Sequence, residues 1–272
     1  MPKTILITGA TDGIGLATAK MLAQEGHRVL LHGRSQAKLE AALAAVGDGG
    51  DGGRDGGATS YLADFSNLAD VKRMAAEIAR DRQHIDALIN NAGVLKASDP
   101  VTADGYDIRF VVNMFAPMVL TRELMPLFSD ESRIINLSSA AQAPVDLAAL
   151  AGKRQLDDMG AYAQSKLAIT MWSLALAQSQ PQGPVVIPVN PGSLLASKMV
   201  KEGFGIAGSD LSKGATILRN LALEDQFASA SGKYYDNDIG QFGPPHRDAL
   251  DAAKASAVLQ ATETAVAEIL AG

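Results

Sequence analysis

The amino-acid sequence predicts one α/β domain over residues 1–272, in which helices cover both faces of a doubly wound parallel sheet of about seven strands. Strand-like and helix-like patterns alternate along the chain, as helical crossovers between parallel strands require. A glycine-rich turn follows the first apolar run, where a Rossmann-type sheet places its phosphate-binding turn. The 272 residues, 47% of them hydrophobic, are enough for one core of this size.

The first half of the chain reads as three strand–helix pairs and a fourth strand. We expect strands at 5–7, 29–31, 59–63 and 85–89, where short apolar runs occur. Gly26 is placed to end the first helix and Ser35 to cap the second. The helices are marked by apolar residues at helical spacing: Ile14, Ala17, Met21 and Leu22; Leu39, Ala42, Leu43 and Val46; Leu68, Val71, Ala75 and Ile78.

The second half continues the alternation with longer helices. We expect helices at about 103–128, 160–179 and 249–270, with a kink at Pro117 in the first of them. The strands are expected at 133–137, 185–189 and 233–235.

A low-complexity segment interrupts the pattern before the third strand. Residues 47–57 are almost entirely glycine and aspartate, which predicts a flexible loop. We do not expect this loop to bind phosphate, because no strand precedes it and its carboxylates repel anions.

Composition excludes several classes of function. The net charge is −6 and no basic run is present, which argues against nucleic-acid binding. The chain has no cysteine, and its four histidines show no ligand spacing, so we expect no metal site. We see neither a signal peptide nor an apolar stretch of membrane-spanning length, and we expect a cytoplasmic protein. Homo-oligomerisation remains open.

The turn Thr8–Gly15 has the form Thr-Gly-x-x-x-Gly-x-Gly between a strand and a helix. Backbone N–H groups and a helix N-terminus at such a turn attract phosphate. Gly9 permits the tight turn, Gly13 permits close approach of a ligand, and Gly15 permits packing of the helix on the strand. We therefore expect the turn, which also contains Thr11, Asp12 and Ile14, to bind a dinucleotide.

Polar or small residues follow several other strands. In a doubly wound sheet these positions share one edge, at which ligands bind. Asn, Gly and Ser also end strands for purely local reasons, so the pattern alone is weak. The positions are Asp64 and Phe65; Asn90, Asn91, Ala92 and Gly93; Ser138 and Ser139; and Asn190, Pro191 and Gly192.

Tyr162 and Lys166 lie four residues apart on an expected helix, and therefore on one face of it. A free phenol has a pKa of about 10, and lowering it by about three units takes roughly 4 kcal/mol. An ammonium at about 4 Å supplies that much at an effective dielectric constant near 20. The pair could therefore exchange a proton with a carbonyl or alcohol during hydride transfer, without a metal.

These motifs, in this order, resemble those of the short-chain dehydrogenase/reductase family. The resemblance implies that Tyr162 is the general acid/base and that Lys166 lowers its pKa and holds the nicotinamide ribose. It implies that Ser139 orients the substrate carbonyl, with Ser138 as a neighbouring alternative, and that Asn113 completes a proton relay through water. The catalytic set is then Asn113, Ser139, Tyr162 and Lys166.

The same resemblance implies the cofactor contacts beyond the glycine turn. Asp64 would read the adenine amino group, and the Asn-Asn-Ala-Gly segment would lie beneath the adenosine. Pro191 and Gly192 would flank the nicotinamide, with Ser193 or Ser197 in place of the threonine usual in the family. The expected cofactor-binding residues are Gly9, Thr11, Asp12, Gly13, Ile14, Gly15, Arg34, Asp64, Phe65, Asn91, Ala92, Gly93, Tyr162, Lys166, Pro191 and Gly192.

The end of the second strand indicates the choice of cofactor. An acidic residue there would bind the ribose 2′-hydroxyl of NAD, but this chain has His32, Gly33 and Arg34. Arg34 can bind a 2′-phosphate in bidentate fashion, and Lys38 lies one helical turn further on. We expect NADP(H), with NAD(H) as the alternative, although Asp12 puts a negative charge in the glycine turn.

The substrate is a small-molecule carbonyl or alcohol on this interpretation. The segments 140–160 and 193–232 are rich in apolar residues and are expected to form the pocket wall and lid of a medium-sized lipophilic substrate. The first of these segments, together with residues 164–167 and 232–238, resembles the retinol-dehydrogenase-like branch and its protochlorophyllide-reductase relatives. The alternative function is a catalytically silent dinucleotide sensor on the same fold.

Overall fold

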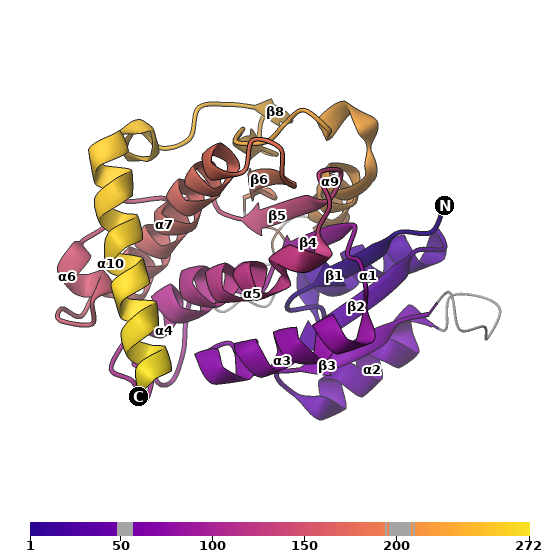
Figure 1. The fold of residues 1–272 in the computed structure, drawn as a ribbon, viewed down its shortest axis with the longest axis horizontal. Helices are drawn as coiled ribbons and strands as arrows, with labels where there is room; N and C mark the ends of the chain where they lie inside the picture. Colours follow the sequence, from indigo (N-terminus) through magenta and orange to yellow (C-terminus); the bar gives the residue numbers. More distant parts are fainter. Residues whose placement is uncertain (48–56, 194, 196–207, 209) are drawn as a thin grey trace.

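The computed structural model describes residues 1–47, 57–193, 195, 208 and 210–272, and it contains one continuous sheet between two layers of helices (Figure 1). Within these residues the sheet has eight strands, in the order β3-β2-β1-β4-β5-β6-β7-β8. All neighbouring strands are parallel except β7 and β8. The strands are β1 (Thr4–Ile7), β2 (Arg28–Gly33), β3 (Thr59–Leu62), β4 (Ala87–Asn90), β5 (Arg133–Leu137), β6 (Val185–Asn190), β7 (Tyr235–Asp236) and β8 (Gln241–Phe242).

Helices cover both faces of the sheet, as expected for a doubly wound fold. Two buried apolar clusters separate the sheet from its two helix layers. One layer contains α1 (Gly13–Gln24), α2 (Gln36–Val46) and α9 (Leu211–Leu223). The other contains α3 (Leu68–Asp81), α4 (Ile108–Phe110), α5 (Ala116–Leu124), α7 (Asp158–Ser179) and α10 (Ala252–Ala271).

The buried face of α1 differs from the one expected. Gly15, Thr18, Ala19 and Leu22 are buried, whereas Ile14, Ala17 and Met21 are only partly buried. The small side chains let the helix approach the sheet closely, and α9 packs against the larger ones from the side. The expected core residues of the next two helices are confirmed as buried or packed against the core.

The long helix expected from residue 103 begins at Ile108, because residues 101 and 107 pair as an isolated β-bridge before it. Pro117 has no N–H to donate to the Asn113 carbonyl, and a π-helical turn, Val111–Phe115, directly precedes α5. The segment Ile108–Leu127 is 20 residues long and apolar enough to cross a membrane by length and composition, contrary to our sequence expectation. Within this segment, 72% of the apolar 18-residue stretch is buried inside the domain.

Other differences lie near the C-terminus and in the loops. Strand β7 begins at Tyr235 rather than 233, and β8 pairs with it as an antiparallel edge strand that the sequence did not indicate. A 3₁₀ turn, Arg247–Leu250, precedes α10. The helices α6 (Leu147–Leu150) and α9 lie in segments expected to be pocket wall and lid. Residues 48–56 of the expected glycine–aspartate loop lie outside the described residues.

Candidate active site

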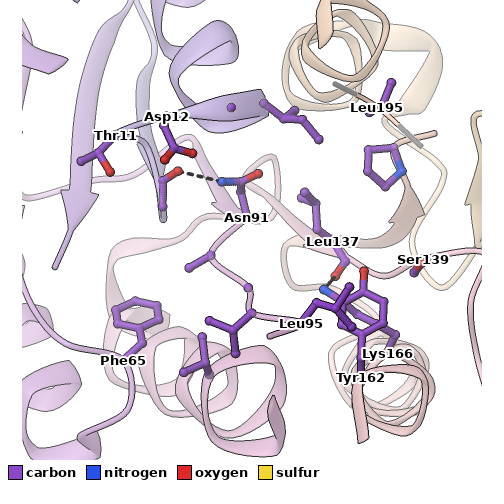
Figure 2. A pocket seen from close by; sticks show the side chains of 18 of the residues that line it. Thr11, Asp12, Phe65, Asn91, Leu95, Leu137, Ser139, Tyr162, Lys166 and Leu195 are labelled. Atoms are coloured by element: carbon purple, nitrogen blue, oxygen red, sulfur yellow. Dashed lines mark hydrogen bonds between the residues drawn. The ribbon is translucent and has the colours of Figure 1, made fainter. Parts of the chain in front are cut away.

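A cleft of about 890 Å³ runs along the carboxyl ends of the parallel strands. It extends from the glycine turn after β1 to Tyr162 and Lys166 on α7 (Figure 2). Every residue of the expected cofactor set lines it except Gly15, which lies beneath the turn. Of the expected catalytic set, Ser139, Tyr162 and Lys166 line the cleft, whereas Asn113 lies behind its wall.

The glycine turn forms a cradle that leaves no room for side chains. Gly9 and Gly13 adopt positive φ angles of 64° and 55°, which favour glycine. A Cβ atom on Gly9 would lie 2.9 Å from the Ala92 Cα, and one on Gly15 would lie 2.4 Å from the Gly9 oxygen. The expected role of these glycines in close packing is therefore supported by the geometry.

Asn91 and Thr8 attach this turn to the end of β4. The Asn91 Nδ2 donates to the Thr8 and Gly9 carbonyl oxygens at 2.8 and 3.0 Å. The Thr8 Oγ1 accepts from the Ala92 N–H at 2.9 Å. Asn91 thus holds the glycine turn as well as lining the cleft.

The N-terminus of α1 opens into the cleft. Asp12 occupies the N-cap position, but its side chain makes no capping hydrogen bond. The first backbone N–H groups of the helix are therefore left for a ligand, and together with the glycine cradle they fit the diphosphate of a dinucleotide.

His32, which we had not singled out as a site residue, lies at the base of the adenosine end. It is buried and stacks on Phe65, with ring centroids 3.9 Å apart. Its Nδ1 accepts from the Gly9 N–H at 3.2 Å, so its Nε2 carries the proton and donates to the Ala63 oxygen at 3.1 Å. Burial lowers the pKa of His32 to about 4, which keeps the ring neutral. The sequence feature that could have identified His32 is its position near the end of β2, two residues before Arg34.

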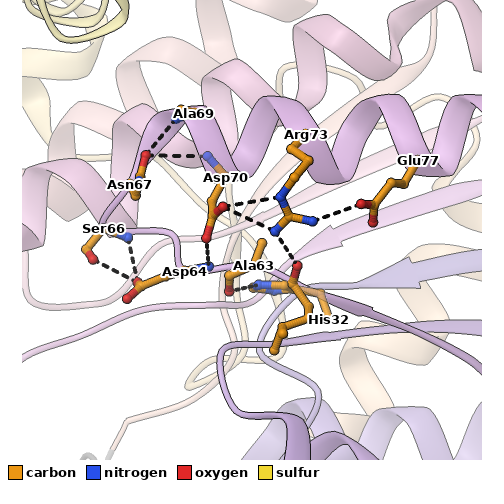
Figure 3. A network of polar contacts seen from close by, with 10 residues as sticks. His32, Ala63, Asp64, Ser66, Asn67, Ala69, Asp70, Arg73 and Glu77 are labelled. Carbon is orange, nitrogen blue, oxygen red and sulfur yellow. Dashed lines mark hydrogen bonds and ion pairs between the residues drawn. The ribbon is translucent and has the colours of Figure 1, made fainter. Parts of the chain in front are cut away.

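A polar network braces the loop that carries Asp64 (Figure 3). The Asp64 carboxylate accepts from the Ser66 N–H and hydroxyl at 2.9 and 2.8 Å. The Asp64 N–H donates to Asp70, which also pairs with Arg73 on α3. The network holds Asp64 at the cleft, where the family resemblance placed it.

Arg34 is exposed at the carboxyl end of β2 and lines the cleft. Within the described part of the chain, no hydrogen bond or ion pair holds its guanidinium. Lys38 lies 3.9 Å from the Asp12 carboxylate, and both side chains are more than half exposed. Such a pair is weak in water, so it leaves the ammonium available to an anionic ligand.

The two serines after β5 have different surroundings. The Ser138 hydroxyl is buried, lies 2.7 Å from the Thr170 Oγ1 and donates to the Lys166 carbonyl oxygen at 3.1 Å. Ser139 is partly exposed in the cleft, where its hydroxyl accepts from the Ala141 N–H at 3.1 Å and favours a lower pKa of the neighbouring Tyr162 phenol. Of the two serines, Ser139 is thus the one whose side chain is open to the cleft.

The Tyr162 ring and the Lys166 side chain lie side by side on the wall of the cleft (Figure 2). The Lys166 Nζ lies 5.6 Å from the ring centroid and donates to the Leu137 carbonyl oxygen at 2.7 Å. Burial lowers the pKa of Lys166 to about 8. Burial raises the pKa of Tyr162, and the neighbouring Ser139 hydroxyl opposes this rise. This differs from the expected lowering of the Tyr162 pKa, because desolvation of the phenol is the largest effect in the structure without a bound ligand.

Asn113 connects the π turn to the segment after β4. Its Oδ1 accepts from the Val94 N–H at 2.8 Å, and its Nδ2 donates to the Val94 oxygen at 3.0 Å and the Ser165 Oγ at 2.9 Å. The side chain is buried and fully committed to these groups. A relay through Asn113 would therefore use its backbone carbonyl, which Pro117 cannot engage.

The turn Pro191–Gly192 closes the other end of the cleft and is held by the segment between β7 and β8. The Asp238 carboxylate accepts from the Ser193 N–H at 2.7 Å and from its hydroxyl at 2.5 Å. Asn237 donates to the Pro191 oxygen at 2.8 Å. Ser193 is therefore engaged by Asp238, and Ser197 lies outside the described residues.

The fold and this cleft define a dinucleotide-dependent oxidoreductase on a doubly wound sheet. A family model described as short chain dehydrogenase matches residues 3–204. The chain belongs to the short-chain dehydrogenase/reductase family and is an NAD(P)-dependent oxidoreductase of the CH–OH/C=O class.

Relatives and solved structures agree with this assignment. Retinol dehydrogenase 13 from Homo sapiens is 33% identical over 263 residues, which are 86% of this chain and 76% of that protein. This similarity confirms the retinol-dehydrogenase-like branch. An uncharacterized protein from Mycobacterium Paratuberculosis matches the fold with a TM-score of 0.78, at 26% identity over 98% of this chain and 95% of its own. A short chain dehydrogenase from Burkholderia cenocepacia in complex with NADP matches with a TM-score of 0.69, at 26% identity over 88% and 97%.

Proposed function

We propose that the protein reduces a lipophilic carbonyl compound with NADPH, with Tyr162 as the proton donor. The observation that carries the proposal is that Ser139, Tyr162 and Lys166 line the same cleft, which fits a dinucleotide. Burial raises the pKa of Tyr162, so the phenol is protonated at neutral pH, as reduction requires.

The chain's own residues would act as follows. The Ser139 hydroxyl donates to the substrate carbonyl oxygen and fixes the carbonyl next to Tyr162. The chemistry that NADPH would supply when bound is hydride donation to the carbonyl carbon. Tyr162 gives its proton to the oxygen, which becomes the alcohol, and the resulting phenolate is stabilised by Ser139 and by the Lys166 charge. Lys166 would also hold a ribose hydroxyl in exchange for its bond to Leu137.

NADP(H) is the proposed cofactor because Arg34 stands at the carboxyl end of β2 without a partner in the described part of the chain. Its guanidinium and the Lys38 ammonium are available to a 2′-phosphate. The solved relative in complex with NADP is consistent with this choice.

The proposed substrate is medium-sized and lipophilic. Apolar side chains line the cleft near Tyr162: Val94, Leu95, Val112 and Leu195. We propose that segments 140–160 and 193–232 form its wall and lid, although residues 194, 196–207 and 209 lie outside the described part. We also propose a cytoplasmic location, because the sequence has no cysteine and needs no oxidising compartment.

The test is a panel of retinal, aliphatic aldehydes and aromatic ketones with NADPH, in which consumption of NADPH is followed by its absorbance. We expect turnover on lipophilic members and loss of at least about 10²-fold in kcat for Tyr162→Phe, with NADPH affinity retained. Tight NADPH binding without turnover would instead indicate the dinucleotide sensor. Turnover that persists in Tyr162→Phe would refute the proposed chemistry.

A further inference from the structure

A second tyrosine approaches the substrate side of the cleft from the opposite end of the chain. Tyr234 directly precedes β7, and its side chain is buried, with 5% of the residue surface exposed. Its hydroxyl donates to the Ser139 carbonyl oxygen at 3.1 Å, although 95 residues separate the two in sequence. Burial raises the pKa of Tyr234 well above its usual range, so the hydroxyl remains a donor.

Gln142 hydrogen-bonds to both partners of the contact between Tyr234 and Ser139. Its Nε2 donates to the same Ser139 carbonyl oxygen at 2.8 Å and to the Tyr234 hydroxyl at 3.3 Å. The Ser139 carbonyl therefore accepts two hydrogen bonds, which is the full capacity of its oxygen. The Ala141 N–H donates to the Ser139 Oγ at 3.1 Å. The backbone and the side chain of Ser139 are both held within one short turn.

This arrangement has a consequence for the hydroxyl of Ser139. Because its oxygen accepts from the Ala141 N–H, its hydrogen is left to donate to another acceptor, such as the Tyr162 oxygen or a substrate oxygen. A rotation of the 139–142 turn would move that hydrogen away from both.

We infer that Tyr234 and Gln142 are positioning residues for the reaction: they clamp the Ser139 carbonyl and thereby aim the Ser139 hydroxyl at Tyr162. This inference rests on the proposed function, in which Ser139 orients the substrate carbonyl. Neither residue lines the cleft, so neither acts on the substrate directly.

The chain supplies a matched control in the next residue. Tyr235 is also buried, but its ring packs against Phe227 and Phe242 in the other apolar cluster. Its hydroxyl makes no hydrogen bond within the part of the chain that the structure describes. Tyr235→Phe and Tyr234→Phe remove the same atom from adjacent positions, and only the second removes a contact with Ser139.

The first measurement is steady-state kinetics with NADPH and the best substrate of the panel. We expect Tyr234→Phe and Gln142→Met each to lower kcat about three- to tenfold, since each leaves one donor on the Ser139 carbonyl. The kcat of the double variant should fall by a factor larger than the product of the two single reductions. The KM for NADPH should be unchanged, and Tyr235→Phe should behave as wild type.

The second measurement is the pH dependence of kcat, which a general loss of stability would not shift. A loosened Ser139 hydroxyl stabilises the Tyr162 phenolate less, so the apparent pKa should rise in Tyr234→Phe, in the same direction as in Ser139→Ala. Hydrogen exchange of the 139–142 amides should accelerate in Tyr234→Phe and not in Tyr235→Phe.

The outcomes separate the two proposals. No turnover by the wild type on any carbonyl would refute the proposed function itself. Wild-type turnover with kcat, pH profile and amide exchange all unchanged in Tyr234→Phe would overturn only the positioning role. An equal loss in Tyr234→Phe and Tyr235→Phe would also overturn it, because the effect would then be structural.

Discussion

The Lys166 ammonium donates a 2.7 Å hydrogen bond to the carbonyl oxygen of Leu137, the last residue of β5. Both groups are buried, and this bond ties the helix that carries Tyr162 to the centre of the sheet. Its geometry explains why the lysine is ordered within the cleft without a carboxylate partner. Burial without a counter-charge is also why the pKa of Lys166 falls to about 8.

Cofactor affinity should therefore weaken as pH rises through about 8, because Lys166 then loses the proton it needs to donate to a ribose hydroxyl. The loss should approach tenfold per pH unit where the ammonium is required for binding. Titration of NADPH fluorescence between pH 7 and pH 10 measures it. The Lys166→Arg variant stays charged over this range. Its affinity for NADPH should therefore not show the same dependence on pH, even if that affinity is lower than in the wild type. An identical pH dependence in both proteins would contradict this role.

Gly15→Ala should destabilise the protein and weaken NADPH binding. The new Cβ would lie 2.4 Å from the Gly9 oxygen and 2.5 Å from the Asn91 Nδ2, and the first contact is with backbone that cannot move without deforming the phosphate cradle. Overpacking of this kind costs about 1–3 kcal/mol. Urea unfolding gives the free energy, and fluorescence titration gives the affinity.

Gly243→Ala is the matched control, because its Cβ would meet only the Ile239 Cδ1 at an ordinary 3.6 Å. It should change the free energy of unfolding by less than about 0.5 kcal/mol and leave binding intact. Equal losses from the two alanines would show that the cradle is not the cause.

His32 should make the folded state sensitive to mild acid. Its pKa is about 4 in the folded protein and 6.5 when unfolded, so between these values the unfolded chain binds the additional proton. Stability from this group is therefore complete above about pH 6.5 and is lost as pH falls towards 4. Between pH 7 and pH 5 the loss should be about 2 kcal/mol.

The measurement is urea unfolding of wild type and His32→Asn at both pH values. The variant should be less stable at pH 7, because it lacks the stacking on Phe65, but its stability should fall less on acidification. Parallel pH profiles for the two proteins would exclude His32 as the titrating group.

Arg34→Ala should lower the preference for NADPH over NADH roughly ten- to hundredfold, because a charge-assisted hydrogen bond to the 2′-phosphate contributes about 1.5–3 kcal/mol. The ratio of kcat/KM for the two cofactors measures the preference. Arg80→Ala is the control and should leave the ratio unchanged. It removes the same charge, but the Arg80 side chain is 74% exposed on α3 and does not line the cleft. An unchanged ratio in Arg34→Ala would show that Arg34 does not bind the 2′-phosphate.

The sequence predicted the sheet, the helix layers and the cleft because these follow from local patterns. Short apolar runs that alternate with helix-like segments specify parallel strands. Parallel strands bring their carboxyl ends to one edge of the sheet. The glycines of the turn, Ser139, Tyr162 and Lys166 could therefore be placed from their order along the chain.

Contacts between distant segments could not be predicted in this way. His32 was dismissed as one of four scattered histidines, but its neighbours come from the ends of two other strands: Gly9 follows β1, and Ala63 and Phe65 follow β3. The face of α1 that is buried was misjudged, since close approach to the sheet selects small side chains over large ones. The edge strand β8 was missed because its two residues form a strand only by pairing with β7.

The kinds of chemical groups at the cleft are thus a property of the chain's linear order, whereas their electrostatics depend on what packs around them. Spacing alone put an ammonium on the same helix face as a phenol, and folding then directed that ammonium to the Leu137 carbonyl. Burial raises the pKa of Tyr162 and lowers that of Lys166, because a low-dielectric interior disfavours the charged form of each. Desolvation is a property of three-dimensional surroundings, so no pattern of residues along the chain could have supplied its sign.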